Sequence, residues 1–240
     1  MSEPQKTGSP AVRQMFSSIA GRYDFLNRLF SLGTDVRWRR ELVAQIPAGD
    51  QPVLDVATGT ADVALTLEER HPGKGLIVGA DFTWSMLQVG AQKISKAPTR
   101  RIRLTAGDAY SLPFRDGTFG AVTISFGLRN LAHRPEALRE MVRVLAPGGK
   151  VVILEFSPSH KPVLGPLFRF YFHTVMPWVG GIVSGNPGAY RYLPESVQQF
   201  PGTKELAREM TEAGFTKVTY RALAMGIAYL HVGEKAASSV

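Results

Sequence analysis

The stretch that most constrains the fold is residues 53–62, in which an apolar run passes through a small-residue turn into a second apolar pattern. This order predicts a buried strand, a tight turn and the start of a helix. A second apolar run, over residues 76–80, closes with Asp81. Strand, turn, helix, strand and terminal acid form the layout in which a carboxylate meets the ribose hydroxyls of a bound nucleoside.

The turn itself limits the kind of ligand that it can hold. Gly59 lets the backbone pass close to a ligand, and Thr58 and Thr60 add small hydroxyl-bearing side chains. Neither the glycine-rich dinucleotide fingerprint nor a P-loop is present. The flanking acids Asp55 and Asp62 favour a cationic ligand over a polyphosphate, and S-adenosylmethionine, a sulfonium, fits that description. An ordinary turn between strand and helix is the alternative interpretation.

Later segments extend the same pattern to a complete sheet. The predicted strands and helices are a strand over 102–109, a strand over 121–126, a helix over 135–145 closed by Pro147, Gly148 and Gly149, a strand over 150–156, a helix over 203–213 ended by Gly214, and strands over 217–222 and 226–232. Asp108 is placed to accept a hydrogen bond from an adenine amino group, while the Ala109 backbone N–H donates to the ring. Acids at the ends of the first three strands are therefore expected to converge on one edge of the sheet.

Several segments outside the strands carry a narrower resemblance: residues 23–27, 31–33, 38–39, 124–130, 147–149, 154–157 and 190–196. Together with the turn, they resemble the class I S-adenosylmethionine-dependent methyltransferases, and within these the ubiquinone/menaquinone biosynthesis C-methyltransferase family. The resemblance implies an α/β fold with a doubly wound, mostly parallel, seven-stranded, Rossmann-like sheet, an antiparallel edge strand and a helical cap.

The resemblance also implies the cofactor and its contacts. The cofactor is S-adenosylmethionine, and Thr60, Asp81, Asp108, Ala109 and Ser125 are the contacts carried over from the family. The turn adds three residues to this expected set: Asp55, Thr58 and Gly59. The implied reaction is C-methylation of a polyprenylated quinol, demethylmenaquinol to menaquinol, with a benzoquinol of ubiquinone biosynthesis as the alternative substrate.

Catalytic residues are expected where the fourth strand ends. Arg129 is a candidate to steady a developing phenolate or to orient a water that takes its proton, and Asn130 is a candidate substrate contact. The alternative for Arg129 is a salt bridge with Asp24 or Glu155. His173 is a candidate base. The alternative is a histidine of the core whose ring nitrogens are hydrogen-bonded within the protein.

The remaining candidates come from the two ends of the pocket. Tyr23, Asp24 and Asn27 belong to an N-terminal helix that is expected to fold over the cofactor and touch the substrate. Tyr190, as a catalytic candidate, and Arg191, as a substrate contact, are expected to close the pocket from the side of the cap. Capping and loop hydrogen bonds are the alternative for the N-terminal group.

The chain is expected to form one methyltransferase domain over residues 12–240, after a flexible tail over 1–11. N-terminal helices are placed over 12–46 and the cap insertion over 158–200. The apolar stretch 163–183 approaches the length of a membrane span, but Arg169, His173 and internal proline and glycine residues interrupt it. A cap that accepts a polyprenyl tail or rests on the bilayer surface is expected instead.

The amino-acid composition limits the kinds of ligand and partner that the chain can bind. The absence of cysteine excludes disulfides, thiolate metal sites and a cysteine nucleophile, and the five histidines are too scattered to predict a metal site. We expect a cytoplasmic enzyme, peripheral at the inner face of the cytoplasmic membrane, that forms a homodimer. A net charge of +8 also suits a nucleic-acid methyltransferase, but the Asp/Asn-Pro-Pro-aromatic motif of base-modifying enzymes is missing after strand four, and no nucleic-acid partner is expected. A non-catalytic cofactor-binding protein is the third hypothesis.

Overall fold

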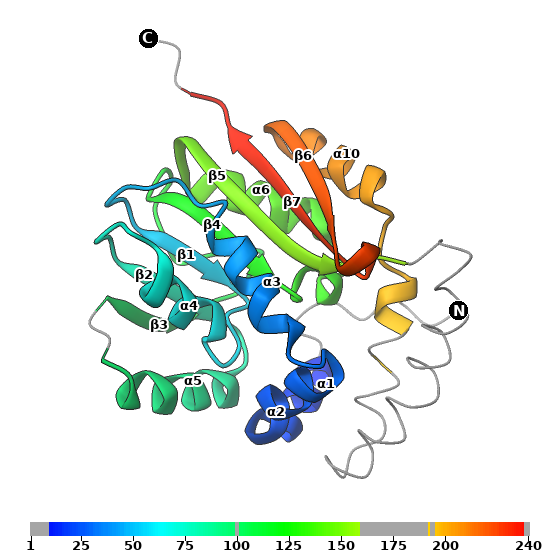
Figure 1. Cartoon of the computed structure of the whole chain (residues 1–240). Coiled ribbons are helices and arrows are strands. Elements are labelled where there is room, and N and C mark those ends of the chain that lie inside the picture. The colour runs from blue at the N-terminus through cyan, green and yellow to red at the C-terminus, as the bar shows by residue number, and fades with distance from the viewer. Residues whose placement is uncertain (1–9, 99–100, 159–191, 193–194, 238–240) are drawn as a thin grey trace.

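The computed structural model describes residues 10–98, 101–158, 192 and 195–237, and its centre is a seven-stranded sheet with the order β3-β2-β1-β4-β5-β7-β6 (Figure 1). The strands are β1 (Val53–Val56), β2 (Ile77–Asp81), β3 (Ile102–Ala106), β4 (Phe119–Ser125), β5 (Leu145–Phe156), β6 (Phe215–Leu223) and β7 (Ala228–Lys235). The first five strands pair in parallel, and β7 runs antiparallel to both of its neighbours, β5 and β6. The predicted doubly wound, mostly parallel α/β fold is therefore confirmed, with the antiparallel strand next to the edge strand β6.

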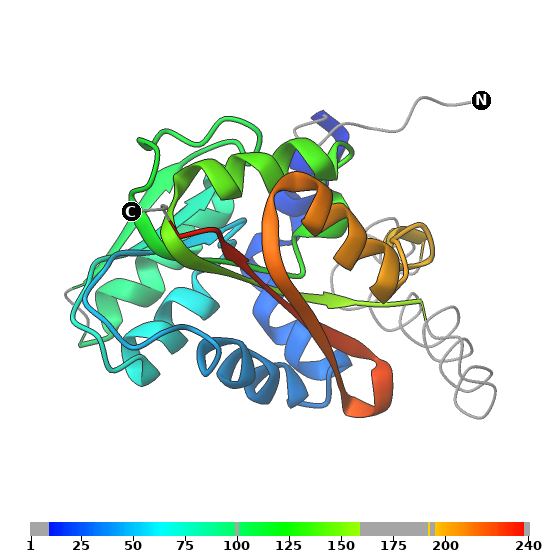
Figure 2. The ribbon, with the colours of Figure 1, turned by 90° about the horizontal axis from the view of Figure 1, so that it is seen from above.

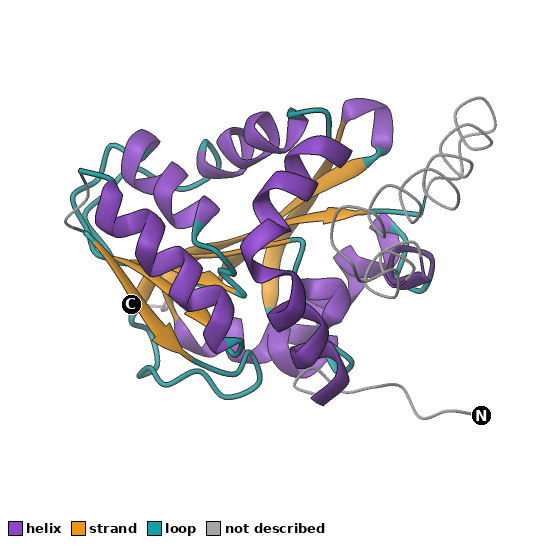
Figure 3. Ribbon diagram, turned by 90° about the horizontal axis from the view of Figure 1, so that it is seen from below, coloured by secondary structure: helices purple, strands orange, loops and turns teal. Residues whose placement is uncertain are grey.

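Helices cover both faces of the sheet, as the views from above and below show (Figures 2 and 3). They are α1 (Pro10–Ile19), α2 (Tyr23–Phe30), α3 (Thr34–Val43), α4 (Asp62–Arg70), α5 (Trp84–Lys96), α6 (Arg134–Val144) and α10 (Thr203–Ala213), with short 3₁₀ turns at Ala20–Arg22, Leu128–Asn130 and Ala224–Gly226. Helices α6 and α10 share one apolar core with the sheet, and α3 and α4 share the other. Helix α1 begins at Pro10, inside the segment expected to be a tail.

Side-chain alternation along the strands builds these two cores. On β5, Val151 and Ile153 pack with the core under α6 and α10, whereas Val152 and Leu154 pack with the core under α3 and α4. Because consecutive residues of a strand point to opposite faces, a strand buried on both faces must be apolar at every position. This is why the central strands appear in the sequence as continuous apolar runs.

The helix before β5 ends differently from its prediction. The sequence placed residues 147–149 after the helix as its stop, but α6 already ends at Val144 and β5 begins with the next residue, Leu145. Leu145 is fully buried and pairs with Phe119, and the register then jumps so that Ala121 pairs with Lys150. The proline and glycines therefore form an irregularity within the strand, where Gly148 adopts a left-handed φ of +75°.

The end of α10 agrees with its prediction. The helix runs from Thr203 to Ala213, and Gly214 follows with a φ of +111°, a conformation that favours glycine. Among the described residues, no helix combines the length and the apolar character needed to cross a bilayer. The apolar stretch 163–183 and most of the predicted cap lie outside the described residues.

One buried titratable group lies in the antiparallel part of the sheet. His231 of β7 is 2% exposed, and its Nε2 donates to the carbonyl oxygen of Thr203 at 3.1 Å. Its Nδ1 has no hydrogen-bond partner within the described part of the chain. Burial lowers the pKa of His231 to about 4, because the protein interior disfavours the charged ring.

This histidine predicts a loss of stability in acid. Between pH 6.5 and about 4 the unfolded chain binds a proton at His231 that the folded chain does not, so stability falls as the pH falls. The loss is at most about 3 kcal/mol. Urea unfolding of wild type and His231→Phe should show wild type losing about 2–3 kcal/mol relative to the variant between about pH 7 and about pH 4.5. Other groups titrate in both chains and cancel, so parallel pH profiles would contradict the assignment.

Candidate active site

The site lies where the strand order reverses, between β1 and β4, at the carboxyl ends of the parallel strands. Loops after β1, β2, β3 and β4 and the N-terminal helices enclose a pocket with about 620 Å³ of empty space, including its open mouth. The predicted site residues that line it are Tyr23, Gly59, Asp81, Asp108, Ala109, Ser125 and Asn130. A switch point of this kind is where open α/β sheets bind ligands.

Asp81 is held at the end of β2 by backbone donors. Its Oδ2 accepts from the Gly59 N–H at 2.8 Å, and its Oδ1 accepts from the Thr83 N–H at 2.7 Å. Burial raises the pKa of Asp81, and the Thr83 and Gly59 hydrogen bonds oppose that rise. Each carboxylate oxygen can accept a further hydrogen bond, so the side chain is fixed in place with capacity for two hydroxyl donors. A ribose with its two vicinal hydroxyls matches that capacity.

Gly59 leaves the floor of the pocket open. Its φ is +55°, which favours glycine, and a Cβ added there would meet no protein atom within 4 Å. The space beside the Gly59 backbone is thus available to a ligand, and a side chain at this position would enter it. This geometry agrees with the reason for which the sequence singled out Gly59.

Asp108 and Ala109 form the wall after β3. Asp108 is exposed, and its Oδ1 accepts from the Tyr110 N–H at 3.0 Å, which fixes the carboxylate beside the pocket. Ala109 is 9% exposed and packs with the core that includes Leu131, another lining residue. A fixed acceptor beside an apolar wall suits the amino group and ring of an adenine.

Asp55 and Thr58, two of the predicted cofactor contacts, lie behind the pocket lining. The Asp55 carboxylate accepts from the Thr58 hydroxyl at 2.6 Å and from the Thr123 hydroxyl of β4 at 2.7 Å, and Asp55 is 1% exposed. Burial raises the pKa of Asp55 to about 7, against the lowering effect of both hydroxyls. In this structure the two residues tie the turn to β4.

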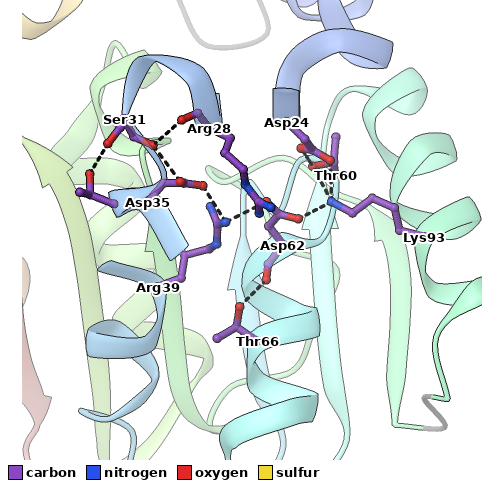
Figure 4. Close-up of polar contacts among 10 residues, drawn as sticks. Asp24, Arg28, Ser31, Asp35, Arg39, Thr60, Asp62, Thr66 and Lys93 are labelled. Carbon is purple, nitrogen blue, oxygen red and sulfur yellow. Dashed lines mark hydrogen bonds and ion pairs between the residues drawn. The ribbon is translucent and has the colours of Figure 1, made fainter. Parts of the chain in front are cut away.

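Thr60, also a predicted cofactor contact, takes part in a charge network beside the pocket (Figure 4). Its hydroxyl donates to Asp24 Oδ1 at 2.5 Å, and Lys93 Nζ of α5 contacts Asp24 Oδ2 at 2.7 Å. Lys93 also pairs with Asp62 at the start of α4, and Asp62 pairs with Arg39 at 3.2 Å. The network joins α2 and α3 to the turn after β1. It also compensates the negative charge of Asp62, which the sequence analysis expected to favour a cationic ligand.

The network predicts a role for Lys93 in holding α2 in place. Lys93 is 26% exposed, and Lys93→Met would remove the cation whose Nζ lies 2.7 Å from Asp24 Oδ2. Amide hydrogen exchange in α2 should then become about tenfold faster, corresponding to about 1 kcal/mol of local stability. Lys96→Met makes the same change at an exposed position of the same helix and should have no effect. Equal exchange in the two variants would contradict this role.

Arg129 forms a buried ion pair, which was the alternative that the sequence left open. Its Nη1 lies 2.8 Å from Glu155 Oε1 and donates to the Phe126 carbonyl at 2.5 Å. The side chains of Arg129 and Glu155 are 7% and 1% exposed. Burial raises the pKa of Glu155, and the Arg129 charge opposes that rise. Arg129 Nε makes no hydrogen bond within the described ranges, so this donor remains available to a water molecule or a ligand.

The polar groups next to Arg129 face the pocket. Asn130 lines it, and Asn130 Oδ1 accepts from the Tyr192 hydroxyl at 3.0 Å. Burial raises the pKa of Tyr192 and of Tyr23, and the Arg129 charge opposes both rises. Asn27, a predicted substrate contact, hydrogen-bonds Tyr23. The predicted residues His173, Tyr190 and Arg191 lie outside the described residues.

Sequence reasoning missed the apolar lining and the partner of Asn130. Phe16, Phe82, Met86 and Leu131 line the pocket together with the polar groups. Phe82 directly follows Asp81, so its position next to a strand-end acid was a usable signal. Tyr192 belonged to a segment that carried the family resemblance, but nothing in its spacing pointed to Asn130.

Comparisons with known proteins show which family of sequences this chain resembles. The sequence matches the profile of the ubiE/COQ5 methyltransferase family over residues 4–235. It is 51% identical to the demethylmenaquinone methyltransferase of Thermus thermophilus over 92% of this chain and 100% of that protein. It is also 46% identical to the ubiquinone/menaquinone biosynthesis C-methyltransferase UbiE of Geobacter sulfurreducens, over 93% of this chain and 88% of that one.

Solved structures agree at the level of the fold. The chain resembles the [4+2]-cyclase SpnF with a TM-score of 0.71 and 14% identity over 97% of both chains. It resembles a chain from the complex of the Haloferax volcanii Trm112 methyltransferase activator with a methyltransferase, with a TM-score of 0.67 and 16% identity over 92% of this chain and 97% of that one. With a profile match that spans nearly the whole sequence, the chain belongs to the ubiE/COQ5 methyltransferase family.

Proposed function

We propose that this methyltransferase uses S-adenosylmethionine to methylate a ring carbon of a polyprenylated demethylmenaquinol, giving menaquinol. The observation that carries the proposal is the pocket at the switch point. In it Asp81 and Asp108 present hydrogen-bond acceptors, and Gly59 leaves the backbone open to contact with a ligand. Relatives that are 51% identical to nearly the whole chain are named demethylmenaquinone methyltransferases, which supports the naphthoquinol as acceptor.

The donor half of the pocket fits S-adenosylmethionine, the cofactor that the family and its fold imply. Asp81 would hold the ribose hydroxyls, Asp108 and the Ala109 backbone would hold the adenine, and the backbone at Gly59 would lie against the rest of the donor. Ser125, at the end of β4, lines the same space and would add a hydroxyl contact. When bound, the cofactor supplies an electrophilic methyl group on a sulfonium.

The half of the pocket that would bind the methyl acceptor must make a ring carbon of that acceptor electron-rich. A quinol meets that need when one of its hydroxyls loses or shares its proton. We assign Asn130 and Tyr23, which line the pocket, to orienting the quinol hydroxyl. Behind them, the Arg129 guanidinium places a positive charge near the developing phenolate, and its Nε can donate to a water that takes the proton. His173, Tyr190 and Arg191 remain candidates for closing the pocket or accepting this proton.

The apolar lining supports alignment and exclusion of water. Phe16 comes from α1 and Met86 from α5, and Phe126 follows β4 directly. Transfer from an activated donor depends mainly on such alignment in a site from which water is excluded. An aromatic acceptor ring is also the kind of surface that these side chains can contact.

The proposal is tested by incubating the protein with methyl-labelled S-adenosylmethionine and the reduced acceptor, followed by mass analysis of the product. Label on a ring carbon of demethylmenaquinol supports it. A benzoquinol acceptor run in parallel distinguishes the ubiquinone reaction, which the names of relatives such as that of Geobacter sulfurreducens also include. Label transferred to neither quinol, from a protein that binds the donor, would contradict the proposal.

A further inference from the structure

Helix α2 presents large apolar side chains to solvent. Phe25 is 61% exposed, Leu29 is 39% exposed, and Leu32, two residues beyond the helix, is 84% exposed. Phe25 and Leu29, four residues apart, lie on one side of the helix, and Leu32 follows in the turn after it. A face of this kind, defined here as Phe25, Leu29 and Leu32, is unfavourable in water unless something covers it.

The other side of α2 belongs to the active site. Tyr23 lines the pocket, Asn27 hydrogen-bonds Tyr23, and Leu26 is 1% exposed in a small core with Ile19. The helix therefore separates the pocket from the surface, with polar and buried groups on one side and the exposed apolar face on the other. A molecule that meets this face lies next to the pocket.

Two further observations concern exposed apolar residues, one in the turn after α2 and one at the start of α5, beside the pocket. Leu32 has a φ of +51°, in the left-handed region where glycine or asparagine is favoured over a leucine. Trp84, at the first position of α5 and next to the pocket-lining Thr83, is 61% exposed. Exposed tryptophan and leucine side chains are typical of protein surfaces that enter the interface of a bilayer.

The charges around α2 and α3 favour an anionic partner. Each acid of these two helices is paired with a basic group, Asp24 with Lys93, Asp35 with Arg39 and Glu41 with Arg221. Two arginines of α3, Arg37 and Arg40, are exposed in the same segment. With a net charge of +8 for the chain, this segment is complementary to an anionic surface.

We infer that the apolar face of α2 docks the protein on an anionic lipid bilayer, with Phe25, Leu29 and Leu32 entering the interface and nearby arginines meeting the headgroups. The purpose of this contact rests on the proposed function, because a quinol with a polyprenyl tail resides in the bilayer and must reach the pocket from it. The binding itself can be measured without donor or acceptor, so the two proposals fail separately.

The test is sedimentation of the full chain with vesicles of phosphatidylcholine, with and without phosphatidylglycerol. The test variant combines Phe25→Gln, Leu29→Gln and Leu32→Asn, because asparagine accepts the backbone conformation at position 32. The matched control combines Leu76→Gln, Tyr220→Gln and Met225→Asn, at residues that are 41%, 40% and 68% exposed, with Met225 also at a positive φ of +57°.

Wild type and the control are expected to bind vesicles that contain phosphatidylglycerol and to dissociate as salt rises. The test variant should bind at least about tenfold more weakly, because three inserted apolar side chains are lost. Equal binding by the test variant and the control, or no binding by wild type, would overturn the inference.

Two other occupants of the face would give different results, and each would also overturn it. If a second copy of the chain covers the face, the test variant would convert a dimer to a monomer and leave vesicle binding unchanged. If another segment of this chain covers it, the test variant would lower the unfolding midpoint, again with unchanged vesicle binding. Both are read by sedimentation velocity and thermal unfolding on the same samples.

Discussion

Asp81→Ala is expected to weaken binding of S-adenosylmethionine by at least about 100-fold. Hydrogen bonds to a charged acceptor contribute about 1.5–3 kcal/mol each, and the ribose would lose two of them. The change would also free the Gly59 and Thr83 N–H groups that now fix the loops on either side. Because the pocket mouth is open to water, these donors can be hydrated, and the fold should persist. Calorimetric titration with S-adenosylhomocysteine measures the loss.

Two further variants show whether the carboxylate itself is responsible. Asp81→Asn keeps the shape but places an N–H donor where an acceptor is needed, so its affinity should lie between wild type and alanine. Asp116→Ala makes the same charge change at a side chain that is 79% exposed and paired with Arg143, away from the pocket. Equal affinities for all of these proteins would show that Asp81 does not hold the donor.

Arg129→Met is expected to destabilise the fold by about 3–5 kcal/mol, because it leaves the buried Glu155 carboxylate without its cation. The double variant Arg129→Met with Glu155→Leu removes both charges and should recover most of that stability. Urea unfolding of the two single variants and the double variant measures the coupling between the residues. A single Arg129 variant as stable as the double would contradict a structural role for the pair.

The double variant also distinguishes a structural role of Arg129 from a catalytic one. If Arg129 steadies the developing phenolate as proposed, the restabilised double variant should bind the donor normally but turn over at least about 100-fold more slowly. Recovery of full turnover together with stability would mean that Arg129 acts only as the partner of Glu155. Arg129→Ala alone cannot decide this, because a loss of folding would also lower turnover.

The parts of the site that follow from neighbouring residues could be predicted from the sequence. Gly59, Asp81 and Asp108 each lie at or just after the end of a predicted strand, and the carboxyl ends of parallel strands meet at one edge, whereas Ser125 came from the family resemblance. Their gathering around one pocket follows from local pattern and topology together. The antiparallel strand near the edge of the sheet was instead an expectation from the family resemblance.

Long-range packing determined what the sequence did not reveal. Asp55 lies inside β1 and is turned to Thr123 of β4 by the pairing of those strands, 68 positions apart in the chain. The contact of Lys93 with Asp24 likewise joins segments that no periodicity connects. The end of α6 was misjudged because the pairing of Leu145 with Phe119 overrides the local signal of the proline and glycines.

The central claim is that the acids and the glycine turn at the switch point hold the adenosyl part of the methyl donor. A crystal structure of the protein with S-adenosylhomocysteine tests it most directly. The claim predicts both ribose hydroxyls on the Asp81 carboxylate, the adenine beside Asp108 and Ala109, and the Gly59 backbone against the ligand. A nucleoside bound at another edge of the sheet, with Asp81 still facing water, would contradict it.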